Sequence, residues 1–377
     1  MMVAGEASGE MYGARLVEEA RRLDPGISFF GMGGRRMLEA GVDILVDASD
    51  MAVVGLIEVV AHFGVIRRAY TTLRNILRED PPQLLILIDY PDFNLLLARA
   101  AKKAGVKVLY YISPQVWAWR QGRVHRIARL VDHMAVVFPF EVSCYEKTGL
   151  PVTFVGHPLV DMVKHSMSKT EACRSCGLDP SRPVAGLFPG SRKGEVQRLF
   201  PVIIETAKVL KDRFPELQFV IPVASTLTDL DLKPQIDASG LPITLIVGRV
   251  HDVIQSCDAI LTVSGTVTME IALLGVPMVI IYKVSPLTYQ IGRHFIKVDH
   301  IGICNIVSGE RVVPELTQHD AEPCKIADEL SRMLSDSEYA QGIRNKLLRV
   351  RSLLGDSGAS HRVARLAIEL LEQGKRI

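Results

Sequence analysis

The sequence lacks a long apolar segment. No stretch of the 377-residue chain reaches the roughly 18 uninterrupted apolar residues that a membrane-spanning helix needs, although its mean hydropathy of +0.20 is high for a protein without such a segment. The first residues also lack the basic and apolar regions of a secretory signal. We therefore expect a cytoplasmic protein whose apolar residues lie in buried cores or against a membrane surface.

Cysteine is scarce and charge is balanced. Of the six cysteines, only Cys173 and Cys176 have the C-x-x-C spacing of a redox or metal site. A structural zinc site needs a second close pair, so we interpret all six as reduced thiols and expect no metal and no cofactor. The 44 basic and 42 acidic residues leave a net charge of +2, which gives no reason to expect a nucleic-acid partner.

Two halves of comparable size repeat an alternation of strand, turn and helix. A chain of this length exceeds what one ordinary hydrophobic core holds, so two domains are expected. The crossing between them is expected within residues 161–169, just after the last strand of the first half. We predict a first domain at 1–162, a second at 163–345 and a helical C-terminal segment at 346–377.

Residues 84–120 form the clearest unit of this alternation. The five apolar residues 84–88 predict a strand buried on both faces of a parallel sheet, with a helix and a second strand following. Asp89 comes directly after that strand, at the sheet edge where open α/β folds bind ligands. Partial removal from water there would raise its pKa toward the value of a useful general base. Asp92 could do the same chemistry, but N-capping of the next helix also explains it.

Two glycine-containing turns in the second half are typical of phosphate binding. One follows the apolar strand 184–188 and the other follows the strand 258–263. Backbone N–H groups at such turns, together with the dipole of the following helix, favour an anion. Arg192 adds a guanidinium that can form paired hydrogen bonds with a phosphate. The residues of the two turns are Gly190, Ser191 and Arg192, then Ser264, Gly265 and Thr266.

Two stretches place basic residues beside apolar ones. The loop that holds Trp117 and Trp119 runs into arginines at every third position, which on a helix would form a positive stripe able to receive a lipid phosphate. The apolar stretch 51–66 precedes a run of arginines, as in proteins that lie on an anionic bilayer. A solvated surface and a core helix are the respective alternatives. The arginines are Arg120, Arg123, Arg126 and Arg129, and Arg67, Arg68, Arg74 and Arg78.

Several short blocks in order resemble the lipid-A-disaccharide synthase family. They are IDYPDFN at 88–94, YISPQVWAWR at 111–120, PFE at 139–141, GHPL at 156–159, PGSR at 189–192 and PELTQ at 314–318. The chain departs from the family pattern at Glu10, which replaces an Asp, and at Cys304, which stands where the family has Pro before Asn305. The resemblance implies an α/β fold of GT-B type, two Rossmann-like domains with mostly parallel sheets facing across a cleft, and a terminal helix that packs back on the first domain.

The resemblance also implies a reaction. An inverting glycosyltransferase of lipid A and lipopolysaccharide biosynthesis would transfer 2,3-diacylglucosamine from UDP-2,3-diacylglucosamine to 2,3-diacylglucosamine 1-phosphate, through a β-1,6 bond. Inversion takes one displacement, which needs a general base and no covalent nucleophile. We assign Asp89 as that base and Arg192 to the leaving diphosphate. The implied location is the inner membrane, held peripherally from the cytoplasm; a homodimer is compatible with the sequence, which does not specify the oligomeric state.

Site residues divide between donor and acceptor under this resemblance. Glu270 would accept both ribose hydroxyls, with a helix capping box as the alternative. A sugar-nucleotide 2-epimerase and a non-catalytic lipid or nucleotide-sugar binding protein are the rival functions. The UDP side comprises Gly190, Ser191, Arg192, Arg249, Ser264, Gly265, Thr266, Glu270 and Asn305. The acceptor and lipid side comprises Ser8, Glu10, Asp92, Trp117, Trp119, Arg120 and Arg123.

Overall fold

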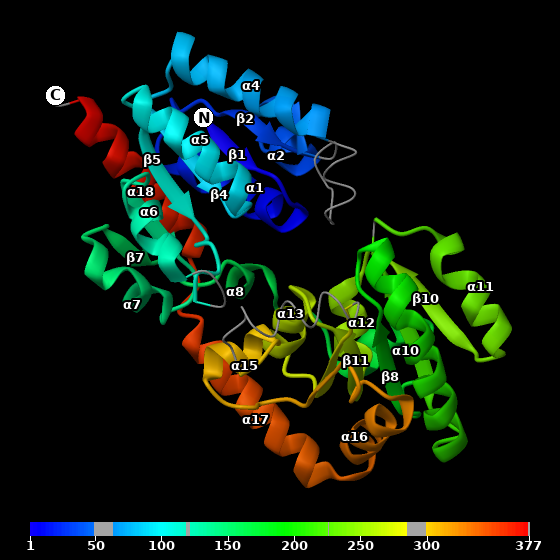
Figure 1. Cartoon of the computed structure of the whole chain (residues 1–377). Coiled ribbons are helices and arrows are strands. Elements are labelled where there is room, and N and C mark those ends of the chain that lie inside the picture. The colour runs from blue at the N-terminus through cyan, green and yellow to red at the C-terminus, as the bar shows by residue number, and fades with distance from the viewer. Residues whose placement is uncertain (49–62, 118–120, 225, 285–298, 376–377) are drawn as a thin grey trace. The chain divides into compact units, whose positions relative to one another are not determined.

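The chain forms two compact units. One comprises Met1–Asp161 together with Leu354–Ile377, and the other Met162–Leu353. The structure, a computed structural model, describes residues 1–48, 63–117, 121–224, 226–284 and 299–375 (Figure 1). Trp119, Arg120 and most of the apolar stretch 51–66 lie outside the described residues.

The first unit is built on a seven-stranded sheet whose strands all pair in parallel. The strand order is β3-β2-β1-β4-β5-β6-β7. The all-apolar strand β4 is buried along its whole length, as expected for a central strand covered on both faces. The strands are β1 (Met2–Ala4), β2 (Phe30–Gly33), β3 (Asp43–Asp47), β4 (Leu84–Ile88), β5 (Lys107–Tyr111), β6 (His133–Val136) and β7 (Val152–Phe154).

Helices cover both faces of this sheet. Helices α4 and α5 pack together on one face, while α1 and α18 pack together on the other (Figure 1). In α4 the apolar residues Ala69, Leu73 and Leu77 recur every fourth position and are buried, which leaves the arginines of this helix exposed. The helices are α1 (Ala7–Leu23), α2 (Arg35–Glu39), α4 (Phe63–Glu79), α5 (Pro91–Lys103), α6 (Val124–Ala128), α7 (Glu141–Tyr145), α8 (Leu159–Met162) and α18 (Ala359–Lys375).

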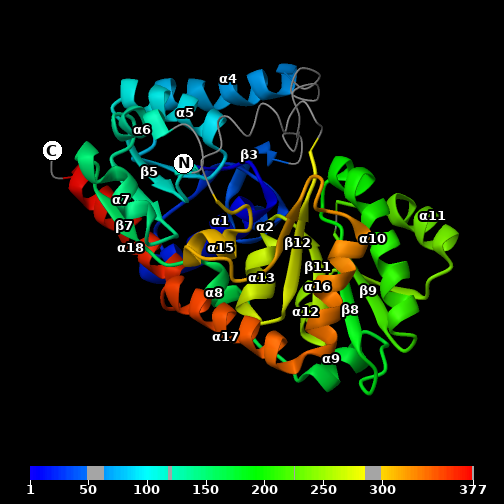
Figure 2. The same ribbon diagram turned by 60° about the horizontal axis from the view of Figure 1, so that its bottom comes forward.

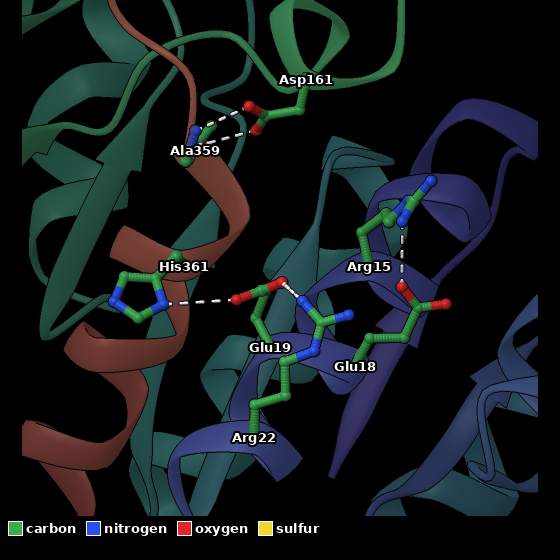
Figure 3. A network of polar contacts seen from close by, with 8 residues as sticks. Arg15, Glu18, Glu19, Arg22, Asp161, Ala359 and His361 are labelled. Carbon is green, nitrogen blue, oxygen red and sulfur yellow. Dashed lines mark hydrogen bonds and ion pairs between the residues drawn. The ribbon is translucent and has the colours of Figure 1, made fainter.

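Helix α18 is attached to the first unit by polar contacts at its start. The carboxylate of Asp161 accepts hydrogen bonds from the N–H groups of Gly358 and Ala359, at 2.6 and 3.1 Å, and so caps this helix. His361 lies 3.3 Å from Glu19 of α1, so the two helices lie side by side (Figure 3). The C-terminal helix therefore belongs to the first unit, as its internal contacts also show.

The second unit is built on a six-stranded parallel sheet in the order β10-β9-β8-β11-β12-β13. Helices α10, α11 and α16 lie on one face and α9, α12, α13 and α17 on the other (Figure 2). Its strands are β8 (Val184–Phe188), β9 (Gln218–Val223), β10 (Ile243–Val247), β11 (Ala259–Val263), β12 (Met278–Tyr282) and β13 (Glu315–Thr317). Its helices are α9 (Lys169–Ser175), α10 (Lys193–Arg213), α11 (Asp229–Ser239), α12 (Val250–Ser256), α13 (Val267–Leu273), α15 (Ile303–Ser308), α16 (Pro323–Ser335) and α17 (Ser337–Leu353).

Helix α17 places the second crossing between the units later than the sequence suggested. It continues to Leu353 and packs on α13 and α15, so the expected boundary at residue 345 falls inside it. The first crossing, between Asp161 and Met162, lies next to the expected one. No helix among the described residues is long and apolar enough to span a bilayer.

Candidate active site

Asp89 lies where the order of strands in the first sheet reverses. The chain adds β2 and β3 on one side of β1 and then crosses over to add β4 and the later strands on its other side. Ligands of open α/β sheets bind at such a switch point, beyond the carboxyl ends of the strands. Asp89 follows β4 there, and Gly5 and Glu6 follow the adjacent strand β1.

The Asp89 carboxyl group is tuned toward proton exchange near neutral pH. Burial raises its pKa to about 7, and the nearby negative charge of Glu6 adds to this effect. A hydrogen bond from the N–H of Tyr90 opposes both but does not cancel them. Asp89 can therefore hold or release a proton at the pH where a general base must work.

Asp92 is a more exposed carboxylate with a different partner. Its side chain is 72% exposed and lies 2.9 Å from Arg123. Helix α5 begins at Pro91 with Tyr90 at the N-cap position, so the expected N-capping role of Asp92 is wrong. Asp92 and Arg123 line a surface hollow of about 200 Å³ whose other lining residues are Leu95, Leu96, Arg126 and Ile127.

The expected arginine stripe is not one continuous helix. Arg123 ends a short 3-10 helix at Gln121–Arg123, Arg126 lies in the five-residue helix α6, and Arg129 only caps that helix. Arg123 is half-buried because it turns toward Asp92. Of the three arginines of this stripe that the structure describes, Arg126 and Arg129 are exposed and Arg123 is half-buried, and Arg123 and Arg126 line the hollow beside α5.

Trp117 is held by the buried carboxylate of Glu141, a role that the sequence did not reveal. Its indole Nε1–H donates to Glu141 at 3.3 Å, and its ring packs edge-on against Phe140. Glu141 is only 2% exposed and also accepts the N–H groups of Val137 and Phe138, at 3.2 and 3.0 Å. Burial raises the pKa of Glu141 to about 7 despite these bonds. The signal that the sequence offers is an acidic residue in the PFE block, a few residues after an apolar strand.

Ser8 and Glu10 lie inside helix α1, because this helix begins at Ala7. Ser8 is partly buried in the first turn. Glu10 accepts the N–H of Arg36 at 2.6 Å and thereby caps the start of α2. Glu10 thus has a structural role, in which its carboxylate lies against Gly34, and its place on the acceptor side stays a prediction.

The two glycine-containing turns of the second unit lie side by side. Strands β8 and β11 are neighbours, with Phe188 opposite Thr262, and the order of strands reverses between them. The turn after β8 uses Gly190 at a φ of +96°, a conformation that favours glycine, and ends at Arg192, the N-cap residue of α10. The turn after β11 leaves Gly265 and Thr266 exposed.

Arg192 is available at the start of a long helix. Its guanidinium is 50% exposed and lies 3.1 Å from Glu195, one turn into α10. The 21 residues of α10 direct the positive end of their dipole at this turn. The arrangement supplies a cation, the N–H groups of a helix start and a helix dipole at one place, which is the chemistry that a phosphate requires.

Glu270 is paired with His251 and does not cap the start of its own helix, α13. Helix α13 shows no side-chain cap at Thr266, so the capping box is wrong. Glu270 Oε2 lies 2.7 Å from His251 Nε2, and this hydrogen bond raises the pKa of His251 against the opposing effect of burial. Oε1 of Glu270 has no part in this pair. The sequence gives no sign of this pair, because His251 stands out there only by its position two residues after Arg249.

The other expected nucleotide contacts have protein partners. Arg249 Nη1 donates to the carbonyl of Ser175 at 3.0 Å, at the end of α9, and Ser264 Oγ donates to the carbonyl of Ile301 at 3.1 Å. Both side chains remain partly exposed. A ligand that used either hydrogen-bonding group would have to compete with a backbone carbonyl of this unit.

Asn305 is buried and hydrogen-bonded within the second unit. It is fully buried, and its Nδ2 donates to the carbonyl of Val313 at 2.9 Å and to Glu315 at 2.6 Å. Its Oδ1 accepts the N–H groups of Val312 and Val313. The amide is therefore occupied on both sides by the segment that leads into β13, and this arrangement does not support the expected nucleotide contact.

No group of three or more His, Cys, Asp or Glu side chains is arranged to hold a metal in the part of the chain that the structure describes. Cys173 and Cys176 are buried free thiols, and burial raises the pKa of each. The C-x-x-C spacing therefore belongs to two protonated thiols at the end of α9.

A model of the lipid-A-disaccharide synthetase family matches residues 1–366. The chain is 64% identical over 377 residues to the lipid-A-disaccharide synthase of Geobacter sulfurreducens, an alignment that covers 100% of this chain and 98% of that relative. The chain belongs to the lipid-A-disaccharide synthetase family. A second member, from Geobacter metallireducens, is 64% identical over 371 residues and is covered to 97%. Membership of the lipid-A-disaccharide synthetase family makes this chain a glycosyltransferase of lipid A biosynthesis.

Solved structures share the fold at low identity. UDP-GlcNAc 2-epimerase from Neisseria meningitidis bound to UDP-GlcNAc superimposes with a TM-score of 0.66 at 15% identity, covering 98% of both chains. The calicheamicin glycosyltransferase CalG4 gives 0.61 at 16%, covering 99% and 97%, and MurG of Acinetobacter baumannii gives 0.58 at 14%, covering 98% and 99%. Identities this low show the fold alone. They confirm the GT-B fold class for this member of the lipid-A-disaccharide synthetase family.

Proposed function

We propose that the chain transfers 2,3-diacylglucosamine from UDP-2,3-diacylglucosamine to 2,3-diacylglucosamine 1-phosphate, forming a β-1,6 disaccharide and UDP with inversion. The observation that carries this proposal is the position of the predicted groups in the two sheets. Asp89 follows a strand at the switch point of one sheet, and Arg192 follows a strand at the switch point of the other. Open α/β sheets bind their ligands at these points.

The second unit would hold the UDP moiety. The diphosphate fits the turn from Gly190 to Arg192, where the dipole of α10 and the guanidinium stabilise negative charge that grows as UDP leaves. The exposed turn at Gly265 and Thr266 offers further donors beside it. Glu270, held by His251 through one oxygen, keeps its other oxygen for the ribose hydroxyls.

Asp89 would act as the general base in a single displacement. Its carboxylate takes the proton of the acceptor hydroxyl while that oxygen forms a bond to C1 of the donor sugar. The bond between C1 and the diphosphate oxygen breaks at the same time, and its electron pair leaves with UDP. A base whose pKa burial raises to about 7 suits this proton transfer near neutral pH.

The first unit would also meet the lipid acceptor at a membrane. Phe63, Val65 and Leu96 are exposed apolar residues at 62%, 40% and 44%, and the exposed Arg67 and Arg68 lie beside the first two. Apolar groups flanked by cations suit peripheral binding to the anionic face of the inner membrane. Trp117 and Arg123 would lie on the acceptor side, and we retain Trp119 and Arg120 there as proposals.

A transfer assay tests the proposed function directly. Purified protein is mixed with both acylated substrates in detergent, and UDP release and product mass are followed together. Acceptor-dependent UDP release with a tetraacyl disaccharide monophosphate would support the proposal. UDP release without the acceptor would indicate hydrolysis or epimerase chemistry, and UDP binding without turnover would indicate a binding protein.

A further inference from the structure

The turn that carries Asp89 has an unusual backbone. Asp89 and Tyr90 adopt φ values of +48° and +47°, so two consecutive residues other than glycine lie in the left-handed region. Side chains with a Cβ atom avoid this region because the Cβ crowds the following carbonyl oxygen. Such a turn persists only when its surroundings hold it, and such turns concentrate at functional sites.

Two buried side chains hold the carbonyl of Asp89. Asn94 is fully buried in α5, and its Nδ2 donates to the carbonyl oxygens of Asp89 at 2.7 Å and Ile88 at 3.2 Å. Tyr110 is fully buried in β5, and its hydroxyl donates to the same Asp89 oxygen at 2.7 Å. Burial and the charge of Asp89 both raise the pKa of Tyr110, so this hydroxyl keeps its proton.

Packing on the other side limits the turn further. The ring of Tyr90 lies against Gly5 so closely that a Cβ added to this glycine would be 2.4 Å from it. The N–H of Asp89 donates to the carbonyl of Tyr111 at 3.1 Å, which ties the residue to β5. The turn is therefore held by the end of β1, by β5 and by α5 together.

We infer that Asn94 and Tyr110 are positioning residues that aim the Asp89 carboxylate at the acceptor hydroxyl, by fixing its carbonyl in the left-handed turn. Both donors bind the backbone of Asp89 and not its carboxylate, so they fix direction without consuming the oxygens that must take a proton. The inference rests on the proposed role of Asp89 as the base. Displacing a catalytic side chain by about 1 Å can lower the reaction rate about a hundredfold, so residues that fix its position matter for catalysis.

Tyr110→Phe removes only the hydroxyl, and Tyr111→Phe is its matched control. The two tyrosines are consecutive in β5 and equally buried, but successive strand residues point to opposite faces, and Tyr111 faces Asp161 and Ser360. We expect Tyr110→Phe to lower kcat about tenfold with the Kd for UDP unchanged, and Tyr111→Phe to keep wild-type kcat. A shifted midpoint in the pH dependence of kcat should accompany the loss in Tyr110→Phe.

Asn94→Leu provides a second variant, since it keeps the approximate size of the side chain and removes both hydrogen bonds from Asn94 Nδ2 to the carbonyl groups of Ile88 and Asp89. We expect the same loss of kcat, with unchanged affinity for UDP. Wild-type kcat and an unshifted pH midpoint in Tyr110→Phe would overturn the inference, and so would an equal loss in Tyr111→Phe. If Asp89→Asn is inactive in that case, the proposed base stands and only the positioning role fails. An active Asp89→Asn would instead remove the base from the proposed function.

Discussion

At the scale of single residues, the burial that raises the pKa of Asp89 also lowers the stability of the folded protein when this carboxyl group is ionised. Its pKa in the folded chain is about 7, above the ordinary value of 3.8, because the folded environment disfavours the charged form. The protonated carboxyl therefore contributes stability that is fully present below the ordinary value and is lost as the pH rises through about 7. The folded protein is therefore less stable when Asp89 is ionised, and this is the form that the transfer reaction needs.

Replacing this carboxylate should thus raise stability while removing activity. We predict that Asp89→Asn has a higher Tm than the wild type at about pH 8 and that the difference shrinks toward about pH 5, because the neutral amide has no charge to bury. Thermal denaturation of both proteins across this range checks the prediction. A Tm difference that is constant with pH would contradict the inferred environment of Asp89.

The His251–Glu270 pair predicts the pH dependence of another variant. The pair raises the pKa of His251 above its ordinary 6.5, so its contribution to stability is present below that value and is lost as the pH rises through the raised one. His251→Ala should lose about 1 kcal/mol at about pH 6, and less at about pH 9, since the histidine is partly exposed. Urea denaturation at both pH values measures this, with Glu270→Gln expected to show the same trend. Equal losses at both pH values would show that the pair is not charged.

At the scale of elements, Glu141 joins the end of β6 to the loop of Trp117. Glu141→Ala would leave the N–H groups of Val137 and Phe138 and the indole N–H without their acceptor. We predict a loss of about 3 kcal/mol in the free energy of unfolding and a change in tryptophan fluorescence, since unpaired buried donors are costly. Glu146→Ala, at an exposed position a few residues on, is the control and should change neither. Unchanged fluorescence in Glu141→Ala would show that the loop does not depend on this residue.

Elements were predictable from the sequence where local signals agree. The apolar runs at 84–88 and 184–188 are the strands β4 and β8 with the expected bounds, and the residues that follow them lie at switch points. The segment around Asp231 has no such apolar run, yet α11 begins there. Thr228 N–H and Oγ1 each lie 2.8 Å from Asp231, a helix cap in a segment whose apolar pattern is weak.

Roles of polar residues were less predictable because their partners are distant in sequence. Glu10 caps a helix 26 positions later, and His251 meets Glu270 on another helix. Asn305 has the chemistry of a ligand contact, yet four bonds to the segment at 312–315 occupy it. Periodicity specifies which face of an element is buried, but it does not specify which polar group meets another.

At the scale of the whole molecule, the two units provide different chemistry. The first carries a buried carboxyl group at its switch point, and it includes α18, which Asp161 caps. The second carries a half-exposed guanidinium at the start of a long helix, beside a second glycine turn. The proposed reaction requires this division, because the base must not be paired with a cation, whereas the leaving diphosphate needs positive charge beside it.

The most direct test measures UDP affinity and transfer rate together for two variants, Asp89→Asn and Arg192→Ala. We predict that Asp89→Asn binds UDP as the wild type does while its turnover falls by about a thousandfold, because only the base is lost. Arg192→Ala should weaken UDP binding by about tenfold and lower turnover by at least about a hundredfold, because the charge-assisted contact to the diphosphate is lost. Wild-type turnover in Asp89→Asn, or unchanged UDP binding and turnover in Arg192→Ala, would contradict this division between the units.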